Sequence, residues 1–461
     1  MRTSSVKQTI HGTNMRAMAI EQKPIQAEKR ILLEHEHVPN IKQIDVYASK
    51  GGYEALKKVF QGKMTPDQVI DEVKASGLRG RGGAGFPTGN KWSFVPKSKD
   101  KPHYLLSNAD ESEPGTFKDR VILEKIPHMM IEGMIIGSYA IGAARSYIYI
   151  RGEYTYGAVV LERAIEEAYQ AGFLGKNILG SGFDHDMVVH RGAGAYICGE
   201  ETGLISSLEG KKGWPKLKPP FPAVEGYLRC PTVVNNVETL AAVPWIIRNG
   251  GAAYTKFGTE KSRGTKMWSV SGDVERPGVY ELELGAPFTA LLNDCCGGMK
   301  NGRKLKAMIP GGSSAPIMTA EESMNCKLDY ESIAAKGSML GSGGMIILDE
   351  TRDLVQVLKN LAEFYHDESC GQCTPCREGT GWVEKILHSF TEKDARKDDL
   401  ELLKTVTNNM LGRTICVLAD SIAMPVQSYI QKFPEEFESY IARSNATGPR
   451  ASIYSHLPGP Q

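Results

Sequence analysis

The sequence predicts three folded units in succession: an α/β domain, a small β-grasp-like domain and a C-terminal four-helix bundle. Between residues 46 and 265, strand-like runs alternate with helical patterns, as in α/β domains. From 266 to 350, short strands alternate with turns. From 351 to 440, apolar residues recur at helical spacing. These units are expected to be flanked by an N-terminal extension at 1–45 and by a loose tail at 441–461.

The first unit is expected to form a sheet with helices around it. Its predicted strands are 103–107, 147–150 and 187–189. Its predicted helices are 66–76, 118–144 and 157–171. Since ligands of open α/β sheets collect at the carboxyl ends of the strands, a cofactor is expected in this unit.

The second and third units are distinguished by their periodicity. The second has predicted strands at 267–271, 279–284, 306–309 and 345–348, a turn at 276–278 and a short helix near 288–292. In the third, four helices are predicted around Leu354, Trp382, Leu403 and Ile422.

Composition excludes some classes of protein. The chain has 461 residues, 41% of them hydrophobic, which is enough for several cores. Lys and Arg (55) nearly balance Asp and Glu (54), so no global positive field suggests nucleic acid or an anionic membrane as a partner. No apolar run approaches the roughly 20 residues of a spanning helix, so any membrane association is expected to be indirect.

Four cysteines form the most informative pattern. Cys370, Cys373 and Cys376 are spaced Cys-x2-Cys-x2-Cys, and Cys416 follows alone. Three thiolates on one tight loop and a distant fourth are typical of a 4Fe-4S cluster. The alternative is a structural zinc site, which usually draws its ligands from two separate short knuckles. A disulfide framework is disfavoured, because the total of nine cysteines is odd.

A glycine-rich loop at Gly80–Gly89 contains G-x-G-x-x-G. A standard dinucleotide fingerprint must follow a strand and open a helix, whereas 69–78 has a helical pattern and Pro87 disfavours a helix directly after it. The remaining interpretations are a loop whose backbone approaches a ring or phosphate, and a plain flexible loop. Phe86, Trp92 and Phe94 are expected either to stack on such a ring or to pack in a core.

Three further segments carry polar groups at expected strand ends or helix starts. Asn108, Asp110, Glu111 and Glu113 follow the first strand and either contact a ligand or cap the next helix. In the segment 191–203, two adjacent carboxylates begin a helix and would repel a phosphate, so a ribose or ring is expected there. The neutral donors of 234–239 suit a phosphate better.

The chain resembles the NADH-binding flavoprotein subunit of respiratory complex I. The resemblance rests on four segments in this order, Gly80–Gly89, 108–115, 192–202 and 368–379, followed by Cys416. The resemblance covers roughly residues 45 to 440. It implies an α/β domain that binds FMN and NADH without a standard Rossmann fingerprint. It also implies a soluble-ligand-binding-like β-grasp domain and a helical bundle that carries one 4Fe-4S cluster.

The resemblance implies a role for individual residues. Those expected to hold FMN are Gly80, Arg81, Gly82, Lys91, Asn108, Asp110, Glu111, Ser112, Tyr196, Gly199, Glu200, Glu201, Asn235, Asn236 and Thr239. Those expected to contact NADH are Phe86, Phe94, Glu113, Glu201, Lys218 and Phe221. The cluster ligands would be Cys370, Cys373, Cys376 and Cys416.

The resemblance further implies that NADH is oxidised by hydride transfer to FMN and that the cluster passes electrons singly towards quinone. The implied partners are a thioredoxin-like 2Fe-2S subunit and a large iron-sulfur subunit, in a complex on the inner face of the cell membrane or the mitochondrial matrix side. Glu201 is expected to disfavour NADPH by repelling its 2′-phosphate. Two other functions stay open: the diaphorase subunit of a soluble NAD-linked formate dehydrogenase or hydrogenase, and a non-catalytic scaffold.

Overall fold

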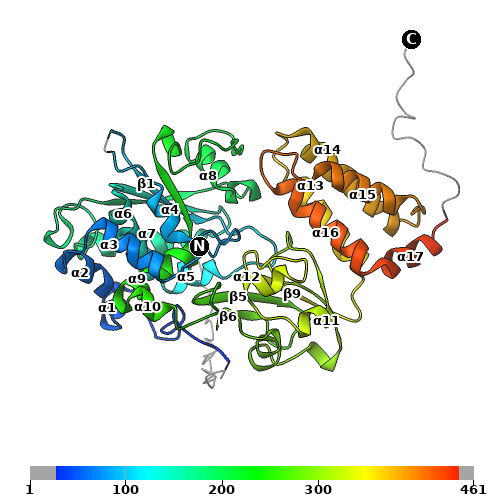
Figure 1. The fold of residues 1–461 in the computed structure, drawn as a ribbon, viewed down its shortest axis with the longest axis horizontal. Helices are drawn as coiled ribbons and strands as arrows, with labels where there is room; N and C mark the ends of the chain where they lie inside the picture. The colour runs from blue at the N-terminus through cyan, green and yellow to red at the C-terminus, as the bar shows by residue number, and fades with distance from the viewer. Residues whose placement is uncertain (1–26, 99, 446–461) are drawn as a thin grey trace, which may run out of the picture.

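The structure, a computed structural model, describes residues 27–98 and 100–445. The expected extension before residue 27 and the expected tail after residue 445 lie outside the described residues. Figure 1 shows a helix-covered sheet, a second sheet beside it, and a group of helices at the C-terminal end of the chain.

The first sheet is parallel and has the strand order β3-β2-β1-β4. Its strands are β1 (Tyr104–Ala109), β2 (Arg145–Ile150), β3 (Asp186–Arg191) and β4 (Thr232–Asn236). The first three agree with the predicted strands, whereas β4 was not predicted. In the central strand, Asn108 pairs with Tyr149 on one side and Asn236 on the other. Asn108 and Asn236 therefore meet at the carboxyl edge of the sheet.

Ten α-helices belong to this part of the described chain. They are α1 (Ile44–Ser49), α2 (Glu54–Gln61), α3 (Pro66–Ala75), α4 (Thr88–Ser93), α5 (Asp119–Lys125), α6 (Pro127–Ile141), α7 (Thr155–Gln170), α8 (Glu201–Leu208), α9 (Val237–Asn249) and α10 (Gly251–Tyr254). Short 3-10 turns lie at η1 (Ile178–Gly180), η2 (Tyr196–Gly199) and η3 (Tyr227–Arg229). Helix α6 is apolar on nearly all sides and is buried among neighbouring helices and strands.

Two sequence predictions were wrong because of proline. The single helix expected over 118–144 is two helices, and Pro127 opens the second, where its missing N–H costs nothing. A helix also starts directly after Pro87, contrary to expectation. Pro87 is extended (φ −60°, ψ 120°) and occupies the N-cap of α4, so its ring does not obstruct the helix.

The second sheet is mixed and has the order β6-β5-β9-β7-β8. Its strands are β5 (Thr265–Gly272), β6 (Gly278–Glu283), β7 (Leu305–Ile309), β8 (Met318–Thr319) and β9 (Gly344–Asp349). The predicted short helix is the π-helix η4 (Ala290–Cys295), and η5 (Lys300–Gly302), α11 (Ala320–Met324) and α12 (Tyr330–Ala334) follow. Trp268, Phe288 and Leu291 are fully buried in its core.

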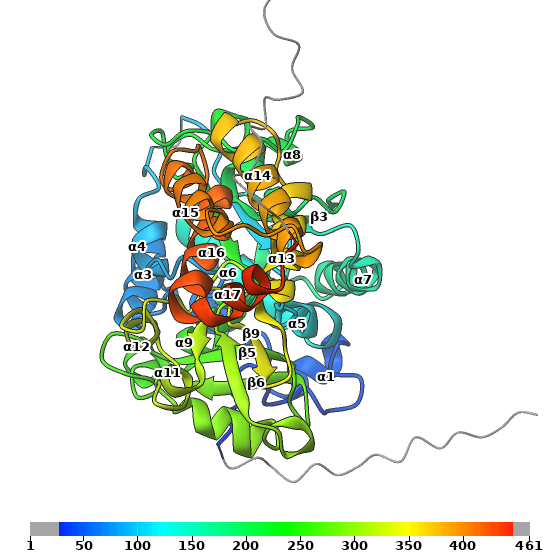
Figure 2. The same cartoon turned by 90° about the vertical axis from the view of Figure 1, so that its right-hand side faces the viewer.

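The C-terminal part has five helices where four were predicted. They are α13 (Leu354–Asp367), α14 (Thr374–Thr391), α15 (Asp399–Met410), α16 (Leu418–Lys432) and α17 (Pro434–Ala442). Pro434 starts the additional helix α17. Figure 2 shows these helices in front of the first sheet and next to the second. No helix of the described residues has the length and apolar character needed to cross a membrane.

A buried carboxylate attaches the described start of the chain to the second sheet. Oε2 of Glu281 in β6 accepts hydrogen bonds from the backbone N–H groups of Ile31, Leu32 and Leu33, at 2.9, 2.9 and 3.0 Å. Its Oε1 accepts from Thr265 Oγ1 at 2.6 Å. The described part of the N-terminal extension is therefore part of the packed structure.

Candidate functional site

A cavity of about 580 Å³ lies where the three parts of the chain meet. The α/β part contributes Gly82, Gly83, Asn108, Asp110, Glu111, Ser112, Glu113, Thr116, Lys118, Asp119, Tyr196, Gly199, Glu200 and Asn236 to its wall. The second part contributes Gly311, Ser314, Met339, Gly341 and Ser342, and the C-terminal part contributes Cys416 to Leu418, Asp420, Ser421 and Met424. A cavity of this size is typical of small-molecule and cofactor sites.

The cavity contains about half of the residues predicted to hold cofactors. Gly82, Asn108, Asp110, Glu111, Ser112, Glu113, Tyr196, Gly199, Glu200 and Asn236 line it. The other ten do not line it: Arg81, Asn235 and Thr239 are buried, and the rest are Gly80, Phe86, Lys91, Phe94, Glu201, Lys218 and Phe221. Apart from Cys416, which was predicted as a cluster ligand, the wall residues from the second and third parts were missed, because they carry no motif and come close only through folding.

The glycine loop is held against the sheet from behind. The N–H of buried Arg81 donates to Thr239 Oγ1 at 2.8 Å, and its guanidinium donates to backbone carbonyls of Arg79, Arg263 and Thr265. A Cβ at Gly82 would approach Cβ of Asn236 to 3.0 Å, which is tighter than an ordinary contact. The loop therefore presents bare backbone to the cavity.

The fit of the cavity to FMN rests partly on Asp110. Its Oδ1 is buried without a hydrogen-bond partner, while Oδ2 accepts from Ser112 Oγ at 2.9 Å. Burial raises the pKa of Asp110 to about 7, despite the opposing hydrogen bond from Ser112. A buried oxygen of this kind needs a partner, and a flavin ring or ribityl chain offers N–H and O–H donors. The wall thus fits the group that the motifs imply.

Two helix starts near the cavity are already capped by side chains. Glu200 is the N-cap of α8, and its carboxylate accepts from the N–H groups of Thr202 and Gly203 at 2.7 and 2.9 Å. This arrangement agrees with the expectation that no phosphate binds there. At α9, Asn236 Oδ1 accepts from the N–H groups of Glu238 and Thr239. Two of the expected phosphate donors of α9, the N–H groups of Glu238 and Thr239, therefore already bond to the side chain of Asn236.

Beyond the cavity, a carboxylate lies between two lysines. Glu201 pairs with Lys91 at 2.9 Å and with Lys218 at 2.6 Å. Burial would raise its pKa, but Lys91 and Lys218 outweigh burial and lower it, so Glu201 is charged. Phe86 and Phe94 are exposed neighbours with ring centroids 6.0 Å apart. Their exposure leaves both rings free to stack on a ligand.

Trp92, the third aromatic residue near the glycine loop, is in the core. It is 1% exposed and donates from Nε1 to Asn235 Oδ1 at 2.8 Å. For Trp92 the core interpretation of the sequence is therefore correct.

The four predicted cluster ligands gather on one side of the C-terminal helices. Cys370 and Cys373 lie between α13 and α14, Cys376 lies in the first turn of α14, and Cys416 precedes α16. The N–H of Ile415, next to Cys416, donates to Cys373 Sγ at 3.4 Å, and Cys370, Cys373 and Cys416 pack against the hydrophobic cluster that contains Cys376. Burial raises the pKa of Cys416 to about 12.

This grouping suits a cluster in which each iron takes its own thiolate. Within residues 27–98 and 100–445, no three Cys, His, Asp or Glu side chains converge as the ligands of one metal ion would. None of the nine cysteines, which all lie within the described residues, forms a disulfide. Because Cys416 also lines the cavity, the cavity and the cysteine cluster are adjacent.

Comparisons with known proteins match these regions. Residues 73–245 match the Nuo51 FMN-binding domain, 267–318 the SLBB domain, and 356–440 the NADH-ubiquinone oxidoreductase-F iron-sulfur binding region. An NADH-quinone oxidoreductase subunit of Rhizobium meliloti is 49% identical over 89% of this chain and 97% of its own length. The corresponding protein of Streptomyces coelicolor is 50% identical over 86% of this chain and 88% of its own length.

The chain belongs to the NADH-quinone oxidoreductase-F family. The resemblance inferred from the motifs is confirmed, and with it an oxidoreductase subunit of the FMN and iron-sulfur type. Among solved structures, an NAD+-reducing NiFe-hydrogenase in the H2-reduced state aligns with a TM-score of 0.76 at 39% identity, over 82% of this oxidoreductase-F homologue and 63% of the hydrogenase chain. The air-oxidised form gives 0.78 at 36% identity, over 92% and 69%.

Proposed function

We propose that this chain is the NADH-oxidising subunit of a multi-subunit NADH-quinone oxidoreductase. The observation that carries the proposal is that one cavity contacts both the residues expected to bind flavin and a cysteine expected to bind the iron-sulfur cluster. The same wall contains the glycine loop at Gly82, the polar edge of the first sheet, and Cys416 of the cysteine cluster. FMN bound there would accept two electrons as a hydride from NADH and release them one at a time, as a 4Fe-4S cluster requires.

We assign the protein's part as binding and positioning. Asn108, Asp110, Ser112 and Asn236 would orient the flavin, with their side chains fixed by the parallel strands and the following turn. Glu201, held between Lys91 and Lys218, and the exposed rings of Phe86, Phe94 and Phe221 would receive the dinucleotide. Gly80, Arg81, Asn235 and Thr239 would support this wall from behind.

The cysteines are proposed as the cluster ligands, in a helical bundle that spans 351–440. The β-grasp-like unit would span 266–350 and close the cavity from the side opposite the first sheet. A thioredoxin-like 2Fe-2S subunit and a large iron-sulfur subunit are proposed as partners in a hetero-oligomer, which would reach the membrane only through the complex. These assignments follow from the family and from the adjacency of Cys416 to the cavity.

The test is reduction of the cluster by NADH. The full chain, reconstituted with FMN, iron and sulfide, should show an EPR signal of a reduced 4Fe-4S cluster after addition of NADH, and the signal should be absent without FMN. Reduction of the cluster by NADH at the same rate without FMN would contradict the proposed route.

The second candidate function is the diaphorase subunit of a soluble NAD-linked enzyme, which the likeness to NAD+-reducing hydrogenase favours. Affinity purification at native expression level, followed by mass spectrometry, separates the two. Membrane subunits of a quinone reductase would support the first function. A nickel or molybdenum catalytic subunit in their place would support the second.

A further inference from the structure

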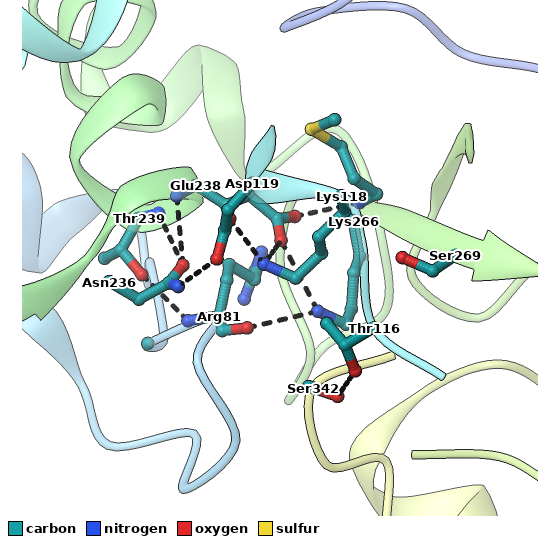
Figure 3. A network of polar contacts seen from close by, with 12 residues as sticks. Arg81, Thr116, Lys118, Asp119, Asn236, Glu238, Thr239, Lys266, Ser269 and Ser342 are labelled. Atoms are coloured by element: carbon teal, nitrogen blue, oxygen red, sulfur yellow. Dashed lines mark hydrogen bonds and ion pairs between the residues drawn. The ribbon is translucent and has the colours of Figure 1, made fainter. Parts of the chain in front are cut away.

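Behind the cavity wall lies a cluster of buried charges that the proposed function does not explain. Lys118, Glu238, Lys266 and Arg81 are each at most 1% exposed, and Asp119 is 3% exposed. They come from the glycine loop, the start of α5, the first turn of α9 and strand β5. Figure 3 shows the charged groups of these side chains pointing toward one another. Buried charges of this number are costly unless each has a partner.

The partners are unequally shared between the two lysines. Lys118 Nζ lies 2.8 Å from both Asp119 Oδ1 and Glu238 Oε2. Lys266 Nζ lies 3.5 Å from the same oxygen of Glu238 and 3.3 Å from the carbonyl oxygen of Arg81. The other oxygen of Glu238 accepts from Met267 N–H at 2.8 Å. The Lys266 ammonium also lies over the Trp268 ring at 5.9 Å, near the limit of a cation–π contact. An ammonium has three N–H donors, so these long contacts leave Lys266 poorly satisfied as a cation.

The pKa values of Lys118 and Lys266 differ in the direction that their unequal contacts with carboxylates predict. Burial alone would lower the pKa of Lys118, but Asp119 and Glu238 outweigh it and raise the pKa above its ordinary value. For Lys266, burial dominates and lowers the pKa to about 7, helped by the nearby cations Lys118 and Arg81 and opposed by Glu238 and Asp119. Lys118 is therefore always charged at neutral pH, whereas Lys266 changes its charge there.

Lys266 lies close behind the wall of the cavity. A Cβ at Gly343 would come within 2.4 Å of Cε and 3.1 Å of Nζ of Lys266, and the adjacent Gly341 and Ser342 line the cavity. On the other side, Lys266 Nζ donates to the carbonyl of Arg81, next to the lining residue Gly82. A change in the charge of Lys266 therefore changes the electrostatic potential in the part of the cavity that Gly82 and Ser342 line.

The cavity itself lacks a free positive charge. Lys118 is the one basic residue in the described lining, and two carboxylates already hold it. The lining also contains acidic side chains, namely Asp110, Glu111, Glu113, Asp119, Glu200 and Asp420. A phosphate, dianionic above its second pKa near 6, needs a counter-charge that this wall does not supply.

We propose that Lys266 supplies this charge by taking up a proton when a phosphate-bearing flavin binds, so that FMN binding is coupled to proton uptake. The inference rests on the proposed function and deepens it. Between the pKa of Lys266 in the free protein and its higher pKa in the complex, each FMN takes up one proton at Lys266. The observed affinity for FMN then falls about tenfold for each unit of rising pH above 7.

The experiment is calorimetric titration of the deflavinated full chain with FMN between pH 7 and 9, in buffers of different ionisation enthalpy. The dependence of the measured heat on that enthalpy gives the number of protons taken up. Riboflavin, which lacks the phosphate, is the ligand control and should show less uptake. Lys266→Met keeps the length of the side chain but cannot take a proton, and should lose both the excess uptake and the tenfold pH slope.

Asp110 is the competing source of protons, because its pKa is also about 7 and it lines the cavity. The same holds for Glu111, whose pKa burial raises to about 7. Riboflavin separates these carboxyl groups from Lys266, because it presents the same ring and ribityl chain to them and lacks only the phosphate. Uptake that persists in folded Lys266→Met would assign the proton to a carboxyl group and overturn the inference.

Comparison of the proton uptake that FMN and riboflavin cause in the wild-type protein tests the inference even if Lys266→Met does not fold. Equal uptake with FMN and riboflavin overturns the inference, and greater uptake with FMN supports it. Binding of FMN without phosphate-linked uptake leaves the proposed function intact. A chain that does not bind FMN at all overturns the proposed function and the inference together.

Discussion

Glu113 joins two parts of the chain at the cavity. Its removal should therefore expose the backbone N–H of Ser314 to hydrogen exchange. Its Oε1 accepts from the N–H of Ser314 at 2.7 Å, and its Oε2 accepts from the hydroxyl of Tyr196 at 2.7 Å. A hydrogen bond to a charged group contributes about 1.5–3 kcal/mol. In Glu113→Ala, the Ser314 amide should therefore exchange its hydrogen roughly ten- to hundredfold faster, since about 1.4 kcal/mol corresponds to a factor of ten.

Hydrogen exchange followed by mass spectrometry, on peptides covering 311–316 in the absence of NADH, measures this effect. Glu113→Gln is the matched control, because its amide oxygen can still accept from Ser314 N–H, and its exchange should stay within about threefold of wild type. Tyr196→Phe removes only the bond to the other oxygen and should leave Ser314 protected. Unchanged exchange in Glu113→Ala would refute the assignment of this bond as the link between the two parts.

Three further predictions follow from other sites. Cys373→Ser should abolish the 4Fe-4S absorbance and EPR signal while bound FMN and NADH–ferricyanide turnover partly survive; loss of flavin from the folded variant would contradict the separation of the two sites. Glu201→Gln should reduce the ratio of kcat/KM for NADH over NADPH about tenfold by removing a like charge, and an unchanged ratio would exclude that role. Burial raises the pKa of Glu281 from 4.5 to about 7. The stability that its neutral form contributes is therefore full below pH 4.5 and is lost as pH rises through 7, by up to about 3 kcal/mol. Glu281→Gln should flatten this loss in urea titrations, and a profile parallel to wild type would argue against it.

The sequence predicted the elements whose patterns are local. Strands β1, β2 and β3 and helices α3 and α7 agree within a few residues, because their apolar periodicity depends on neighbouring positions alone. Strand β4 was missed, since Asn235 and Asn236 have low strand propensity and lie in the strand through pairing with β1. Tertiary pairing outweighs local preference there.

The candidate site was predictable where a motif marks it and not elsewhere. Asn108 and Asp110 follow a predicted strand, so their place in the cavity wall could be expected. Lys118 and Lys266 have no such signal. An isolated lysine in a sequence is normally solvent-exposed, and only the convergence of β5, α5 and α9 buries these two. Glu238, expected only as part of a helix start, became their shared partner for the same reason.

The buried cluster also bears on why the cavity forms where it does. Lys118 pairs with Glu238 and Asp119 within the first part of the chain, whereas Lys266 belongs to the second part and contacts a carboxylate, that of Glu238, only when the two parts associate. Separation of the two sheets would leave Glu238 and Lys266 without each other and would expose the carbonyl of Arg81. The association that brings Lys266 to Glu238 also places Ser342 and Gly82 in the lining of one cavity. Docking of the two parts and formation of the cavity therefore occur together, and a variant that disturbs the contact between Glu238 and Lys266 should affect both.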